Sequence, residues 1–466
     1  MQKSARTPVL QPLPDCKMRR PDAPQRPRLF DIAWPMFLEL CLGIGIGVSG
    51  TILAAHINDR SGAAFALANQ LSAMLFILFR VVGAGVSVVV AQSLGSGRRD
   101  TADAVARAVL GASSWVGVVT ALMAFVGAYP LLYLMHAPPE VLPLAAPFLQ
   151  ALAPAMLFDA WNASMAGVMR AHLRMRDALA VMVLMQVIHL VLAMIFMPAL
   201  GLPGFAIALV LSRALGLAMH LFLWRIRLGL IPRISDWWRL PRAALSAVLR
   251  IGLPGAAENI AYRLAFMVSV AVAGQLGAQS LATQAYTLQI SYGALLFGLA
   301  TGLAVEIVVG HMVGAGHLRD AHRLVLRALA RGLAVSVIVA TGAAVAGPWL
   351  LGQFTKDTTI IATGSMLLWW SVLLEPGRTF NLVVINALRA AGDAHYPVIA
   401  GAASMAIVLG GGSWLLGSHL GFGLAGVWIA YAADEWIRGL LMWRRWVRHG
   451  WVSHARVIHR QLQLRE

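Results

Sequence analysis

Long apolar segments separated by short polar stretches make up most of this 466-residue chain. A helix needs about 20 apolar residues to cross a bilayer, and most of the segments reach or exceed that length. The segments are rich in Leu, Ala, Val, Gly and Met and lack the two-residue alternation that is typical of membrane β-strands. Because the backbone must satisfy its own hydrogen bonds in lipid, the pattern predicts an all-α polytopic membrane protein.

Twelve transmembrane helices are predicted, six in each half of the chain. In the first half they cover residues 31–55, 63–92, 104–134, 142–169, 178–199 and 203–225. In the second half they cover residues 247–274, 280–311, 322–352, 358–389, 395–417 and 423–446. Several segments exceed what a bilayer requires, which favours tilted helices or extension into the cytoplasm.

The positions of basic residues predict the orientation of these helices. Every second loop is rich in arginine, as with Arg98, Arg99 and Arg170, whereas the loops between them hold only Arg60 and Lys356. Cytoplasmic loops carry an excess of Lys and Arg. We therefore expect both termini in the cytoplasm and a multi-pass protein of a bacterial-type inner membrane.

Composition and charge support the same class of protein. Charged residues are 12% of the chain, against about 25% in soluble proteins. The formal net charge of +17 would suggest nucleic acid in a soluble protein, but no basic stretch lies in a recognisable nucleic-acid-binding module. We expect the basic residues to contact anionic membrane lipid instead. The two lone cysteines, Cys16 and Cys41, make no metal site, and no cofactor is expected.

The two halves of the chain resemble each other at a constant offset. Pro35 and Glu39 match Pro254 and Glu258, 219 residues apart (254 − 35). The same offset relates residues 92–97 to 311–316, Asn162 to Asn381, and Arg170-Ala171 to Arg389-Ala390. A repeat of six helices keeps both halves in the same orientation, with the substrate path expected between them.

The repeat predicts a division into two bundles with flanking segments. Residues 1–29 are predicted to be a disordered cytoplasmic tail, since they are polar and proline-rich and lack a signal peptide pattern. Residues 30–225 and 247–447 form the N-terminal and C-terminal six-helix bundles. Residues 226–246 are a cytoplasmic linker, and residues 448–466 are a second cytoplasmic tail.

Several motifs occur in this order across residues 30–447. They are Pro35 and Pro254 early in helices one and seven, the segment 91–97 with its twin 310–316, and Leu388-Arg389-Ala390-Ala391-Gly392-Asp393 followed by Pro397. Together they resemble the MATE (multidrug and toxic compound extrusion) family of the MOP flippase superfamily. The resemblance implies a monomeric transporter that exports organic, often cationic, compounds or drugs in exchange for H+ or Na+.

The chain departs from the family pattern in helix one. Many bacterial members carry an Asp in the middle of this helix, near the position of Gly50, where this chain reads Ser49-Gly50-Thr51. A proton mechanism that depends on that single Asp cannot be carried over. Coupling then falls to Glu39 or mainly to the second half of the chain.

Glu258 is the first candidate for cation coupling. An ionisable group within a membrane helix costs about 2.5–3.5 kcal/mol on insertion scales, so it needs a reason. Glu258 follows Pro254 by four residues, where the resemblance implies a functional acid. Burial favours the protonated carboxyl and an arriving cation favours the charged one, so competition between the two would give antiport. The alternative is a neutral side chain, or a pair with Arg263 or with another helix.

Glu39 and Glu375 are the other coupling candidates. Glu39 is the repeat mate of Glu258, and its alternative role is a buried partner for Arg80 or a helix cap. Glu375 and Arg378 lie three residues apart in helix ten, on one face. This pair can bind or gate, or it can be a neutralised structural bridge.

Four residues are candidates for lining the substrate cavity or for gating. Asp159 and Arg378 occupy equivalent positions of the repeat with opposite charges, which suggests an ion pair between the bundles. The alternative is that each has a local partner. Asn162 and Asn381 either line the cavity or form hydrogen bonds between helices.

Other function classes are less well supported by the residues. A flippase for lipid-linked or polysaccharide precursors, from the same superfamily, remains the alternative, although such proteins often have fourteen helices and a basic cavity. An enzyme is not expected, because the chain lacks His-Glu-x-x-His and Gly-x-Ser-x-Gly motifs. No metal centre other than a sodium site is expected, and sodium needs several converging oxygen ligands.

Overall fold

The structure is a computed structural model that describes residues 29–135 and 137–463. Of the predicted tail at 1–29, all but Leu29 lies outside the described residues, and so does Cys16. Within those described residues the chain is helical and contains no strands.

The first half of the chain forms seven helices, which we call the first bundle. They are α1 (Leu29–Ile57), α2 (Asp59–Gly95), α3 (Arg99–Val126), α4 (Ala128–Leu134), α5 (Leu142–Ala171), α6 (Met175–Leu200) and α7 (Leu202–Leu223). A π-helical turn, Trp224–Leu228, and a 3-10 turn, Ile234–Trp237, then lead to the second half. The short α4 is the only helix of this set that is too short to cross a bilayer.

The second half repeats the same order, and we call it the second bundle. It comprises α8 (Arg242–Gln275), α9 (Ala278–Gly314), α10 (Leu318–Val345), α11 (Gly347–Gly352), α12 (Thr358–Ala390), α13 (His395–Ser404) and α14 (Gly423–Val447). Two π-helical segments, Met405–Gly411 and Ser413–His419, continue α13 toward α14. The chain then ends in a further helix, α15 (Val452–Gln463).

The predicted twelve-helix, all-α fold is confirmed. Ten helices within the described residues are long and apolar enough to cross a membrane. The other two are α2, with 37 residues, and α14, with 25 residues and a buried group of charges discussed below. At 1.5 Å per residue, both exceed the roughly 30 Å of a bilayer core.

Two predicted segments each divide into a long and a short helix. The segment 104–134 breaks at Gly127, between α3 and α4, and the segment 322–352 breaks at Ala346, between α10 and α11. Pro130 lies in the first turn of α4, and Pro348 in the first turn of α11. Proline has no backbone N–H to donate inside a helix, but it fits the first turn, where that N–H needs no helical partner. Each proline therefore ends the preceding helix and starts the short one.

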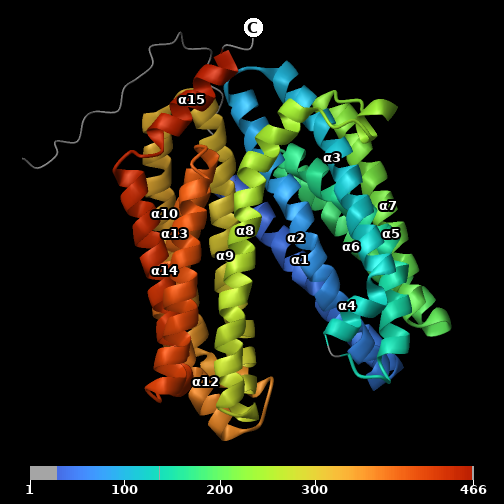
Figure 1. Ribbon diagram of the computed structural model, residues 1–466, viewed down its shortest axis with the longest axis vertical. Helices are drawn as coiled ribbons and strands as arrows, with labels where there is room; N and C mark the ends of the chain where they lie inside the picture. The colour runs from blue at the N-terminus through green and yellow to red at the C-terminus, as the bar shows by residue number, and fades with distance from the viewer. Residues whose placement is uncertain (1–28, 136, 464–466) are drawn as a thin grey trace, which may run out of the picture.

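The two bundles meet at one end and diverge toward the other (Figure 1). They are joined by α1 and α2 of the first bundle, which pack against α8 and α9 of the second. One apolar core combines side chains from both halves, such as Val86 and Val90 from α2 with Ala304 and Ile307 from α9. The helix α15 lies across the end where the bundles meet, and we call this the α15 end (Figure 1).

The helix α15 was not predicted, because residues 448–466 were expected to be a tail. Trp451 stacks on Trp446 with ring centroids 4.2 Å apart, and Val452 and Ala455 are buried in the core of the second bundle. The segment is too short to span a membrane and carries few apolar residues. Its helix is amphipathic and depends on the surface beneath it, which a reading of span lengths cannot reveal.

Candidate functional site

The acids Glu39 and Glu258 form two equivalent ion pairs near the α15 end. Arg170 donates from Nη1 to Oε1 of Glu39 at 2.7 Å, and Arg389 forms an ion pair with Glu258. In both pairs the partners are 131 residues apart in the chain, as the repeat requires. These side chains are only 12–23% exposed, so each pair is only partly screened by water.

The structure identifies the partners of these two acids. Glu258 pairs with Arg389 of another helix, α12, which was one of the alternatives considered, and not with Arg263. Glu39 pairs with Arg170, while the side chain of Arg80 lies outside the described residues. The signal was present, since the repeat already matched Arg170 to Arg389 at the offset that matches Glu39 to Glu258.

A third acid, Glu306, lies in the field of both arginines. It is the only Asp or Glu of α9 and is 3% exposed. The charges of Arg389 and Arg170 both act on it. Glu306 was not among the coupling or cavity candidates from the sequence, and the structure buries it. The three acids and two arginines leave one formal negative charge in excess at this place.

The repeated glycine motif closes the α15 end with crossed hydrogen bonds. Gln92 donates from Nε2 to the carbonyl of Ala390 at 2.8 Å. Its repeat mate His311 donates from Nε2 to the carbonyl of Ala171, also at 2.8 Å. Each bond runs from one bundle to the other. The segments 91–97 and 310–316, which served in the sequence only to recognise the family, therefore form hydrogen bonds that join the two bundles at this end.

Two glycines make this approach of the bundles possible. A Cβ atom on Gly95 would lie 2.0 Å from the backbone oxygen of His311, and one on Gly314 would lie 1.9 Å from that of Gln92. Gly95 and Gly314 are repeat mates. Because both obstructing atoms belong to backbone, no side-chain movement could relieve the clash, and the closed contact requires glycine at both positions.

The predicted ion pair between Asp159 and Arg378 is not formed. Asp159 on α5 pairs instead with Arg213 on α7, with Nε and Oδ1 2.9 Å apart. Arg378 on α12 approaches Glu435 on α14, with Nε and Oε1 3.5 Å apart. Each charge has a partner within its own bundle, which was the alternative considered.

These two pairs are equivalent in the repeat but have exchanged charges. Asp159 matches Arg378, and Arg213 matches Glu435 at the offset of 222 residues that also relates Gly204 to Gly426. An acid on one helix thus became a base, while its partner changed from base to acid. The opposite charges of Asp159 and Arg378 result from this exchange within each pair. They are therefore no sign that the two residues contact each other across the bundles.

The second bundle contains a larger buried charge network. Arg378 also donates from Nη1 to Oε1 of Glu375 at 2.7 Å. Arg438 pairs through Nη2 with Asp434 at 2.7 Å and with Glu435 at 2.8 Å. All five side chains are at most 8% exposed. Three acids and two arginines again give one excess negative charge, which burial makes costly unless a proton or a cation neutralises it.

Glu375 carries the free position of this network. Its Oε2 atom is buried and has no hydrogen-bond partner in the part of the chain that the structure describes. Glu375, Ser291 and Ser371 line a small cavity of about 50 Å³ between α9, α10 and α12. A water molecule needs roughly 10–15 Å³ of such space, so the cavity can hold a water or a small ion.

Asn162 and Asn381 join helices within their own bundles. Asn162 donates from Nδ2 to the carbonyl of Arg213 and interacts through Oδ1 with His220, both at 3.0 Å. Asn381 donates from Nδ2 to Oε2 of Glu435 at 3.0 Å. Both asparagines are less than 5% exposed. Of the two roles considered for them, the structure shows hydrogen bonds between helices.

The helix-one position where many relatives carry an acid is occupied by an aromatic cluster. A Cβ atom on Gly50 would lie 2.2 Å from the ring of Phe65. The rings of Phe65 and Phe205 pack edge to face at 4.9 Å, and His189 lies against Phe205 at 4.6 Å. The first bundle therefore has no room for a side chain at this position, and its charged pair, Asp159 with Arg213, is balanced.

No group of three metal-binding side chains occurs among residues 29–135 and 137–463, where side chains are described. Apart from Glu306, the acids discussed above are each paired with arginine. The arrangement places buried carboxylates beside arginines in both bundles.

Comparison with known proteins identifies the family. The MatE family model matches residues 35–195 and 254–411, one match in each bundle. The chain is 31% identical to "Uncharacterized transporter YisQ" of Bacillus subtilis, over 91% of this chain and 95% of that protein. It is 25% identical to "Probable multidrug resistance protein NorM" of Agrobacterium fabrum, over 87% and 90% of the two chains.

Solved structures agree in fold. A structure described as "Crystal structure of MATE in the bent conformation" superposes with a TM-score of 0.84 at 20% identity, over 92% of this chain and 96% of that one. A second, "Outward-facing conformation of a multidrug resistance MATE family transporter of the MOP superfamily", gives 0.82 at 20% identity, over 91% and 96%. From the matched model, the related sequences and the repeated six-helix fold, this chain is a member of the MATE family of membrane transporters.

Proposed function

We propose that this protein exports organic, cationic compounds in exchange for protons or sodium, by alternating access of its two bundles. Relatives named as multidrug resistance proteins, such as NorM of Agrobacterium fabrum and PmpM of Pseudomonas aeruginosa, support drug export. As a member of a transporter family it is not an enzyme. The observation that carries cation exchange is the buried excess of negative charge in the second bundle.

The proposed orientation places the α15 end in the cytoplasm of a bacterial inner membrane, with both termini on that side. The arginine-rich loops that include Arg98, Arg174 and Arg319 adjoin this end, as the positive-inside rule requires. The two bundles, 30–225 and 247–447, are then closed toward the cytoplasm and diverge toward the outside. The protein acts as a monomer in this proposal.

Glu375 is the proposed coupling residue, with Glu258 and Glu39 in support. All three acids pair with an arginine, but Glu375 also has a buried Oε2 without a hydrogen-bond partner among the described residues, and it lines a cavity of about 50 Å³. A proton on Glu375 neutralises the network, and an organic cation or sodium ion bound nearby favours the charged carboxylate and releases the proton. Arg378 holds Oε1 of the same group and so fixes the position of the exchanging oxygen.

Gradient-driven efflux from proteoliposomes tests this proposal. Efflux of a fluorescent organic cation is measured under an imposed proton or sodium gradient for wild type, Glu375→Gln and Glu140→Gln. Glu140 is the matched control, since it is an exposed acid that pairs with the exposed Arg60. We expect Glu375→Gln to lose gradient-driven efflux and Glu140→Gln to keep it, with both variants monodisperse in size-exclusion chromatography.

The other outcomes are informative as well. Unchanged efflux by Glu375→Gln would contradict the assignment, and the same assay on Glu258→Gln and Glu39→Gln would then locate the coupling acid. If folded wild type moved no organic cation under either gradient, the export proposal would be wrong. Transport of lipid-linked or polysaccharide precursors by a flippase would then be the function to test.

A further inference from the structure

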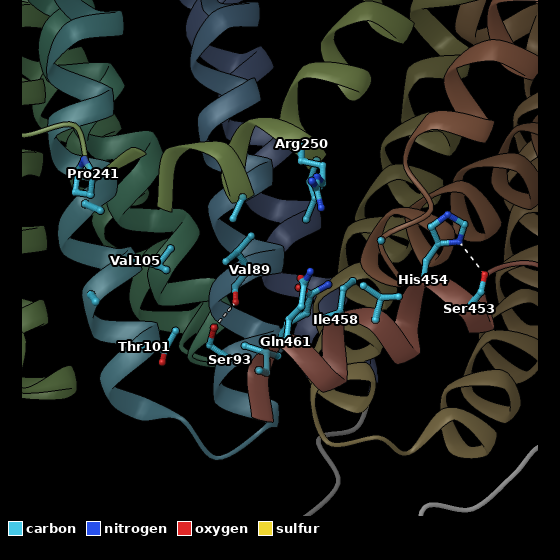
Figure 2. A pocket seen from close by; sticks show the side chains of 18 residues that line it. Val89, Ser93, Thr101, Val105, Pro241, Arg250, Ser453, His454, Ile458 and Gln461 are labelled. Atoms are coloured by element: carbon cyan, nitrogen blue, oxygen red, sulfur yellow. Dashed lines mark hydrogen bonds between the residues drawn. The ribbon is translucent and has the colours of Figure 1, made fainter. Parts of the chain in front are cut away.

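A cavity of about 630 Å³ lies at the α15 end, between the two bundles. Residues of α2 and α3 line one side, and residues of α8 and α15 line the other. Figure 2 shows Val89 and Val105 on one side and Ile458 and Gln461 on the other, with Arg250 above them. Ligand pockets typically measure 300–1,000 Å³, so this one can take a ligand of substantial size.

The lining of this cavity is apolar with a positive charge. Val89, Val105 and Ile251 represent its aliphatic majority, while its ionisable side chains are Arg250 and His454. No Asp or Glu lines it. Arg250 is exposed and has no ion-pair partner among the residues that the structure describes. An organic cation would meet only a positive charge here, so the cavity does not suit the substrate class proposed above.

The position of the cavity indicates where its ligand comes from. Its outer wall is α15, an amphipathic helix that buries Val452, Ala455 and His459 and leaves Arg456 and Arg460 exposed. It begins shortly after the end of the membrane-spanning α14 at Val447, which places it near the level of the lipid headgroups. On the side of α8, the lining combines the exposed Arg250 with the buried Ile251. A ligand there would have its polar part near water and its apolar part within the protein.

We propose that this cavity binds an anionic phospholipid, with the phosphate held by Arg250 and His454 and an acyl chain along the aliphatic lining. The arginine fork matches phosphate geometry and forms charge-assisted hydrogen bonds with it. Because α2 and α3 belong to one bundle and α8 and α15 to the other, the lipid contacts both. Its binding therefore favours the arrangement that is closed at the α15 end.

Native mass spectrometry of the purified full-length chain tests the proposal with two lipids of identical acyl chains. We expect wild type to bind phosphatidylglycerol more tightly than phosphatidylcholine. Loss of a charge-assisted hydrogen bond in Arg250→Gln should weaken phosphatidylglycerol binding roughly five- to tenfold. Arg456→Gln is the matched control, since Arg456 is an exposed arginine of α15 that does not line the cavity. This variant should bind phosphatidylglycerol with the affinity of wild type.

A second variant tests the cavity without changing its charge. Ala104 is a lining residue of α3, and Ala104→Phe places a ring in the cavity. We expect the same loss of phosphatidylglycerol binding, with the melting temperature of wild type. Equal affinity in wild type, Arg250→Gln and Ala104→Phe would overturn the proposal, as would equal binding of the two lipids by wild type. Binding of glycerol phosphate as tight as that of the lipid would mean that the site recognises a free phosphate ester and not a lipid. The measurement uses no gradient and no transport substrate, so it is independent of the export assay.

Discussion

The closed contact at the α15 end should fail when Gly314 gains a side chain. In Gly314→Ala the new Cβ would lie 1.9 Å from the backbone oxygen of Gln92. An ordinary carbon–oxygen contact is about 3.3 Å, so the bundles must separate locally by about 1.4 Å. The hydrogen bonds donated by Gln92 and His311, both 2.8 Å long, would then stretch beyond hydrogen-bond range.

The size of the effect follows from those two bonds. A hydrogen bond within a protein contributes about 0.5–1.5 kcal/mol net, so losing both disfavours the closed arrangement by about 1–3 kcal/mol. That corresponds to a shift of roughly 5–150-fold in the equilibrium between closed and open forms. Gly293→Ala is the matched control, because Gly293 lies in the same helix and has no atom within 4 Å of its Cβ position. Both substitutions are Gly→Ala, so they add the same single methyl group.

Hydrogen–deuterium exchange measures this shift without labels. Peptides that cover residues 85–98 and 304–317 contain the two halves of the contact. We expect these peptides to exchange faster in Gly314→Ala than in wild type, and Gly293→Ala to match wild type. If Gly314→Ala kept wild-type protection in both peptides and wild-type efflux, the crossed hydrogen bonds and the glycine pair would not be what closes this end.

Three further predictions concern charges elsewhere in the chain. Asp159→Asn and Arg213→Gln each break a buried ion pair, and each should lower the free energy of unfolding by about 3–5 kcal/mol. The double variant Asp159→Arg with Arg213→Asp copies the charges of the second bundle. It should recover part of the lost stability in thermal unfolding. Burial lowers the pKa of His172 in the folded chain, so as the pH falls the unfolded chain binds a proton at this residue before the folded chain does. The free energy of unfolding should therefore fall as the pH drops below about 6.5. His172→Gln should reduce the difference in melting temperature between pH 8 and pH 5.5. Hydrogen bonds, above all the one from Gln279, lower the pKa of Asp357. The carboxylate should therefore stabilise the fold above about pH 4, and this stabilisation should be lost below that pH. Asp357→Asn should remove this change of melting temperature with pH in the acid range.

Much of the fold was predictable from the sequence, because it depends on local properties. The predicted helix 142–169 corresponds to α5, Leu142–Ala171, and the predicted helix 358–389 corresponds to α12, Thr358–Ala390. Length and apolar character determine which segments can cross a bilayer, and these are properties of single segments. The repeat added the second level, since equivalent residues such as Gln92 and His311 occupy equivalent places in the two bundles.

The candidate site was predicted in its residues but not in its pairings. Glu39, Glu258 and Glu375 all lie buried or half-buried beside arginines, as acids within membrane helices require. Which arginine meets which acid depends on how helices pack, and neither Arg389 nor Arg213 was chosen from the sequence. The exchanged charges of the Asp159–Arg213 and Arg378–Glu435 pairs illustrate this limit. A sequence repeat shows which positions are equivalent, but it does not show which residues are in contact.

The sequence alone determined that this chain crosses a membrane twelve times, as two similar sets of six helices, because hydropathy and repetition are written along the chain. The tertiary structure alone decided that the buried Glu306 meets the charge of one arginine from each bundle, that Gly95 and Gly314 allow backbone contact, and that α15 covers the closed end. Each of these depends on residues far apart in the chain. Ion pairs, steric contacts and amphipathic surfaces act over a few ångströms in space, and only folding brings such partners within that distance.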